Sequence, residues 1–177
     1  MGRPVFHEYT LDTLVAASLV VVRVERVEPR ERTEDREGLR AVLWPLRILE
    51  VLSFNEAPVK AGGIRRDDLL PPTRVPTSGE LVEVLINRVN LVDQAHRRRS
   101  PAGASFPAQR FRGDPQTVNA CDWIAFLIER GGAFEFTAQG AFVSTAELAA
   151  VQDAIRRAEL SLPTRKAIRK DLLDGRD

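Results

Sequence analysis

The chain has 177 residues, of which 44% are hydrophobic and 29% charged, and its net charge at pH 7 is +1. This length suits one domain with a short appendage, and the apolar content is sufficient for a packed core. The near-zero net charge excludes a global field that would steer the whole protein to nucleic acid or to an acidic membrane. A single cysteine, Cys121, excludes an intramolecular disulfide.

The N-terminal residues lack the apolar segment that a signal peptide needs. The longest apolar runs, such as Leu14–Val22, are too short to span a bilayer. We therefore expect a soluble cytoplasmic protein without a membrane span, or an exported protein if a leader has been removed. The sequence leaves the oligomeric state open.

The first elements are a helical turn and a strand. Thr10–Ala17 has the composition of one or two helical turns, capped by Thr10 or Asp12. Leu19–Val27 alternates with period two and predicts a strand with one face buried throughout. The charged segment Glu28–Gly38 follows, and its lack of apolar residues predicts a solvated loop.

The middle of the chain predicts two long strands and an edge. Leu39–Leu52 predicts a strand with a bulge, an edge or a bend at Pro45, because proline cannot donate to a ladder. Trp44, beside that proline, is expected in the core. A short edge strand near Ile64–Leu70 and a longer strand over Leu81–Val92 come next.

The C-terminal part predicts a hairpin and a capped helix. Asp122–Arg130 and Ala133–Thr137 are joined by Gly131-Gly132, and Ala141–Val143 extends the second strand past a bulge at Gly140. Ser144 and Glu147 predict a capping box in which the Ser144 hydroxyl accepts from the Glu147 amide. The helix runs to about Leu160, with an inner stripe of Leu148, Val151, Ile155 and Ala158.

We therefore predict a mainly β fold with helices: five or six mostly antiparallel strands closed into a small barrel, an N-terminal helical turn and a C-terminal helix. Residues 1–160 form this single domain with its closing helix, and residues 161–177 form a charged tail or short helix. That helix would bring Ile168, Leu172 and Leu173 together, and their stripe either packs on the domain or docks on a partner.

Several segments also resemble a known kind of module. These are the helix and strand of Leu11–Val27, the strand that ends in LRILEVLSF, the run Ile124–Leu127 and the pentapeptide Gln139–Val143. Their order resembles that of bacterial OB-like barrel modules of the netrin/TIMP-like kind, although Arg23 stands where those modules usually carry glycine. The resemblance implies an OB-like barrel with a binding or inhibitory role and points to no particular activity.

No motif indicates catalysis or a cofactor. The histidines and the cysteine, His7, His96 and Cys121, show no paired spacing of the kind that metal sites have, so we expect neither a metal nor a cofactor. Cys121 opens an apolar strand, and we expect a buried structural thiol instead of a nucleophile paired with either histidine.

The longest irregular segment, Gln94–Asn119, is also the most basic part of the chain. Basic residues can hold a nucleic-acid backbone while aromatic residues stack on bases, as in OB barrels that bind single strands. The alternative is a solvated loop whose phenylalanines anchor it to the barrel. The candidate residues for binding a partner or nucleic acid are Arg97, Arg98, Arg99, Phe106, Arg110, Phe111 and Arg112.

Three functions remain open from the sequence. The first is a non-enzymatic interaction module that binds a protein partner through this loop, the barrel rim or the C-terminal tail. The second is single-stranded nucleic-acid binding by an OB-like barrel through residues 94–119. The third is an uncharacterised enzyme that uses Cys121 or scattered acidic residues.

Overall fold

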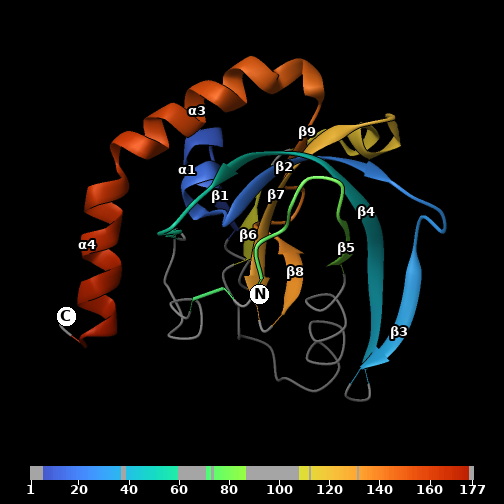
Figure 1. Cartoon of the computed structure of the whole chain (residues 1–177), viewed down its shortest axis with the longest axis horizontal. Helices are drawn as coiled ribbons and strands as arrows, with labels where there is room; N and C mark the ends of the chain where they lie inside the picture. The colour runs from blue at the N-terminus through green and yellow to red at the C-terminus, as the bar shows by residue number, and fades with distance from the viewer. Residues whose placement is uncertain are drawn as a thin grey trace, which may run out of the picture.

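The computed structural model describes residues 6–36, 39–59, 71–72, 74–86, 108–111, 113–130 and 132–175 (Figure 1). Its strands are β1 (Phe6–Glu8), β2 (Val20–Arg26), β3 (Arg32–Arg36), β4 (Leu39–Phe54), β5 (Leu81–Leu85), β6 (Ala108–Arg110), β7 (Trp123–Arg130), β8 (Ala133–Phe136) and β9 (Phe142–Val143). Its helices are α1 (Leu11–Ala17), α3 (Leu148–Leu160) and α4 (Leu162–Leu173), with 3-10 turns η2 (Pro115–Asn119) and η3 (Thr145–Glu147).

Five of the strands close into a barrel. β2 pairs antiparallel with β4 on one edge and with β7 on the other. β4 continues antiparallel to β5, β5 runs parallel to β8, and β8 returns antiparallel to β7. The ring β2-β4-β5-β8-β7 is therefore a closed, mixed five-stranded barrel. The prediction of a mainly β barrel with helices at both ends is confirmed.

Two hydrophobic cores share the strands β2 and β7. Val20, Val22 and Val24 of β2 belong to the core inside the barrel, whereas Val21 belongs to a second core on the barrel's outer surface. The same alternation places Trp123 inside and Phe126 outside. The apolar runs in both strands are unusually continuous because each strand buries both of its faces.

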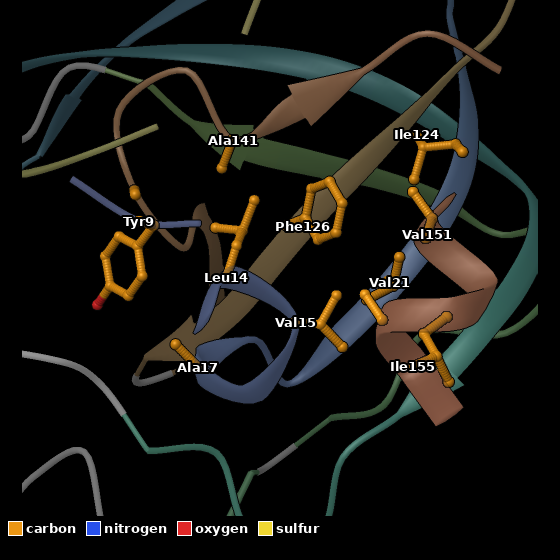
Figure 2. Close-up of a cluster of buried hydrophobic side chains, with 12 residues drawn as sticks. Tyr9, Leu14, Val15, Ala17, Val21, Ile124, Phe126, Ala141, Val151 and Ile155 are labelled. Atoms are coloured by element: carbon orange, nitrogen blue, oxygen red, sulfur yellow. The ribbon is translucent and has the colours of Figure 1, made fainter. Parts of the chain in front are cut away.

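The second core lies under the helices α1 and α3 (Figure 2). Val151, Ala154 and Ile155 of α3 are buried at helical spacing, close to the predicted stripe. Figure 2 shows Val151 and Ile155 on the same side of this core as Val21 of β2, with α1 beside them. The helices therefore cover the outer faces of the two strands that close the barrel.

The start of α3 differs from the predicted capping box. The Ser144 hydroxyl accepts from the Ala146 amide at 3.2 Å, whereas the Glu147 amide donates to the Ser144 carbonyl at 2.9 Å. A 3-10 turn, η3, precedes the α-helix, and its tighter geometry shifts the amide that meets the hydroxyl.

Pro45 lies where β4 changes partners. Residues before it pair with β3 and residues after it pair with β2, so its missing N–H interrupts no ladder at that junction. Its carbonyl accepts from the Val27 amide at 3.3 Å. The register against β2 also skips Leu49 and Leu52, which marks two bulges in this strongly curved strand (Figure 1). The predicted irregularity at Pro45 is therefore a change of strand partner, whereas the two bulges of this strand lie at Leu49 and Leu52.

The prediction of a loop over Glu28–Gly38 was wrong for β3. This charged strand pairs with β4, and Arg32 donates from Nε to Glu83 Oε1 at 2.7 Å and from Nη2 to Glu34 Oε2 at 2.8 Å. One ion pair within β3 and one to Glu83 of β5 thus accompany its ladder with β4. The predicted strand near Ile64–Leu70 and the predicted strand beyond Ile86 lie outside the described residues.

Phe126 offers a test of the outer core. Its side chain is fully buried between β2, α1 and α3, so Phe126→Ala should lower the free energy of unfolding by about 3–5 kcal/mol. Urea unfolding followed by circular dichroism measures the change. Leu160→Ala, at a side chain that is 84% exposed, is the control and should change stability little. A loss below about 1 kcal/mol at Phe126 would contradict this core.

Candidate functional site

Most of the predicted binding residues lie outside the described part of the chain. These are Arg97, Arg98, Arg99, Phe106 and Arg112. The backbone of Arg110 lies in β6, which runs parallel to β1, and its side chain is not described. Phe111 is described: it is half-buried against the outer core, with its ring centroid 6.3 Å from that of Phe126. The predicted set as a whole therefore stays a prediction, and only the placement of Phe111 is described.

The segment at Phe111 is held against the turn before β9. The Phe111 amide donates to the Gln139 carbonyl at 2.8 Å. Gly140 has φ +75°, and a Cβ there would lie 2.6 Å from the Phe111 carbonyl oxygen. Both the backbone angle and the close approach require glycine at this position.

Cys121 is exposed, so the prediction of a buried structural thiol was wrong. The buried part of β7 begins at Trp123, after Asp122, whose carboxylate accepts from Arg23 Nη1 at 3.2 Å. Trp44 is half-buried and packs on the barrel core, with its ring edge-to-face with Phe136. The guanidinium of Arg26 lies 4.2 Å from its ring centroid.

The structure contains a cavity of about 330 Å³ that the sequence did not predict. It opens between the end of β4, α1 and the junction of α3 with α4, and we call it the β4-end groove. Its apolar lining consists of Val15, Phe54, Ile155, Ala158 and Leu162. Its polar lining consists of Ser53, Asn55, Glu56, Glu159 and Arg165.

One wall of the groove is the overhanging end of β4. β5 pairs with β4 only over Leu43–Arg47, and Ile48 still exchanges backbone hydrogen bonds with Gly79 and Glu80. Beyond that point, no described strand pairs with this edge of β4 over residues 50–54. Phe54, the last residue of β4, is 46% exposed at the groove. The wall thus combines a free strand edge with an exposed aromatic ring.

Arg165 joins the three elements around the groove. It is buried, and its Nη1 donates to Asn55 Oδ1 at 2.6 Å and to the Ala57 carbonyl at 2.7 Å. Its Nη2 donates to the Ala158 carbonyl at 2.6 Å, and its Nε donates to Ser161 Oγ at 3.0 Å. Ala158 lies in the last turn of α3, where a cation is favoured by the helix dipole. Burial lowers the pKa of Arg165, although a guanidinium stays protonated.

Asn55 completes this polar network. Its Nδ2 donates to the carbonyls of Ala16 at 3.0 Å and Ser18 at 3.1 Å. Its Oδ1 accepts from the Ala57 amide at 3.0 Å as well as from Arg165. Asn55 thereby fixes the end of β4 to α1, while Arg165 fixes it to α3 and α4.

The face of α4 toward the barrel is basic. Lys166 Nζ lies 2.6 Å from Glu56 Oε2, and Arg169 donates to the Pro58 carbonyl at 2.7 Å. Lys170 is four residues after Lys166 and continues the same side of the helix. The predicted C-terminal helix is present, and Ile168, Leu172 and Leu173 are each more than 40% exposed.

The chain matches no protein-family model, no curated protein and no solved structure. In the part of the chain that the structure describes, no helix is long and apolar enough to cross a membrane. Among the same residues, no three histidine, cysteine, aspartate or glutamate side chains gather in a way that could hold a metal ion.

Sequence reasoning missed the two residues that build the groove. Asn55 falls in what reads as a loop after β4, and Arg165 falls in a charged tail with several other basic residues. The only local signal was Pro163, which suits the first turn of a helix and so marks where α4 begins.

Removing the Arg165 side chain should free α4 from the barrel. Arg165→Ala leaves the carbonyls of Ala57 and Ala158 without this donor, so we expect local destabilisation of α4 by about 2–4 kcal/mol. Hydrogen exchange of the α4 amides measures this change. Lys170→Ala, at an exposed residue of the same helix, is the matched control. Unchanged α4 protection in Arg165→Ala would show that the network does not hold the helix.

The contact between Glu56 and Lys166 predicts a pH dependence. Lys166 lowers the pKa of Glu56 below its ordinary value of 4.5, so the contribution of this pair is fully present above pH 4.5. It is lost as the pH falls through the lower folded-state pKa. The protection factors of the α4 amides, which correct for the pH dependence of intrinsic exchange, should therefore fall on acidification below pH 4.5 more in the wild type than in Lys166→Met. Identical pH profiles for the two proteins would contradict the pairing.

Proposed function

We propose that this protein is a non-enzymatic interaction module that binds a protein partner through the β4-end groove. The observation that carries the proposal is the exposed Phe54 beside a partly apolar cavity and a strand edge that no described strand covers. Exposed aromatic side chains at a hollow are typical anchors of protein interfaces. We prefer the groove to the loop at residues 94–119 as the candidate binding site. Hydrogen bonds from Arg165 hold the elements around the groove together.

The topology of the barrel supports an OB-like module. Its first strand, β2, pairs with both the second and the fourth strands of the ring, and its third strand, β5, runs parallel to the fifth, β8. Five-stranded Greek-key barrels of this kind bind ligands with their outer surface and loops. This likeness agrees with the sequence resemblance to OB-like modules of the netrin/TIMP-like kind and with a binding role.

Nucleic-acid binding is the second hypothesis, and the outer surface of β4 and β5 does not favour it. Arg32 is paired there with Glu83 and Glu34, and Arg47 Nη1 lies 3.8 Å from Glu25 Oε1. Single-strand binding needs unpaired basic groups beside exposed stacking rings. On this surface Arg32 and Arg47 are already paired with acids, which supports protein binding as the better candidate.

The proposal is tested by affinity capture from the native host with wild-type protein and two variants. Phe54→Asp introduces a charge at the groove, and we expect it to lower the affinity for the captured protein at least tenfold, as measured by calorimetry. Val75→Asp is the matched control, because Val75 is 42% exposed and does not line the groove. The control should bind like the wild type.

Equal binding by all three proteins would place the interface elsewhere. Retention of single-stranded DNA by the wild type at low salt, with no protein captured, would favour the nucleic-acid hypothesis instead.

A further inference from the structure

Among the described strands, the outer edge of β3 and the end of β4 are built differently. β3 pairs only with β4 among the described strands, and its sequence, RTEDR, is almost entirely charged. Charged side chains on an edge strand prevent unwanted pairing with another chain. The free edge of β4 carries Val51, Leu52, Ser53 and Phe54 instead, after a single acid at Glu50. Charge therefore protects the edge of β3, whereas residues 50–54 of β4 carry little charge and no described strand pairs with their second edge.

The open edge also runs beside the cavity. Ser53 and Phe54 belong both to the overhanging part of β4 and to the lining of the β4-end groove. A strand added to this edge would alternate its side chains between two faces, so every second residue could face the groove. The 330 Å³ cavity, with Val15 and Leu162 in its lining, offers apolar surface for at least one such side chain.

The charges around the groove indicate which sign of net charge an added segment should carry. Arg165, Lys166, Arg169 and Lys170 recur at three- and four-residue spacing on the side of α4 that contacts residues 55–58, whereas Asp171 falls on the other side. Lys166 pairs with Glu56 at 2.6 Å, so this pair adds no net charge, and the buried Arg165 and the exposed Lys170 remain against Glu159. An acidic segment complements this wall better than a basic one.

We propose that the partner supplies an extended, acidic peptide segment that pairs with the free edge of β4 over residues 50–54. One apolar side chain of the segment enters the groove beside Phe54, and its carboxylates face the basic side of α4. Backbone hydrogen bonds then provide affinity and the cavity provides selectivity, as in other cases of strand addition. This inference rests on the proposed function and adds the conformation and chemistry of the bound segment.

The probe is a display library of random ten-residue peptides selected against the full-length protein. We expect the selected peptides to be rich in β-branched and acidic residues, and to lose binding at least tenfold on Phe54→Asp. Lys170→Glu should weaken the selected peptide about two- to fivefold, whereas Arg40→Glu, an equal charge change on the distal part of β4, should not.

N-methylation of the selected peptide distinguishes a strand from a helix. Only alternate amides of an added strand point at the edge, so single N-methyl groups should abolish binding with a period of two along the peptide. Loss of binding at every second N-methylated position, in peptides rich in acidic and β-branched residues, supports the inference. Helical or basic peptides, a missing period, or no selected peptide at all would overturn it. Each of these contrary outcomes would overturn strand addition alone. The proposed binding of a protein at the groove would still hold if Phe54→Asp weakens binding of the captured partner.

Discussion

The pairing of β2 with β7 is the interaction on which the rest of the structure depends. Its register runs from Val20 opposite Leu127 to Val24 opposite Trp123, and it closes the ring of five strands. The same two strands carry the outer core, so closing the barrel also creates the surface on which α1 and α3 pack. Loss of this pairing would therefore expose both cores at once, instead of opening one edge.

The position of the groove follows from that closure. α3 is fixed by the outer core and ends at Leu160, so α4 must begin beside the end of β4 and α1 (Figure 1). β4 has 16 residues and β5 only five, which leaves the end of β4 without a neighbour from β5. The groove thus lies between the end of β4, which extends beyond β5, and the helices α3 and α4, which meet at Ser161.

Elements with a strong apolar period could be predicted from the sequence, and elements held by charge could not. β2, β7, β8 and α3 were found because their apolar residues repeat at the spacing of a strand or a helix. β3 was missed because its stabilising contacts are ion pairs from Arg32, and such residues read as solvated loop. The groove was missed because Asn55 and Arg165, which meet at 2.6 Å, are 110 residues apart in the sequence.

The polar network behind the groove has a consequence for binding. A strand end with a neighbour on one side only tends to fray, and a partner would then have to order it at a cost in conformational entropy. Asn55 and Arg165 hold the residues directly after β4 to α1, α3 and α4. The edge is therefore fixed in an extended conformation before anything binds. An ordered edge that no described strand covers, beside a partly apolar cavity, is an arrangement in which strand addition costs little, because only the incoming segment must be ordered.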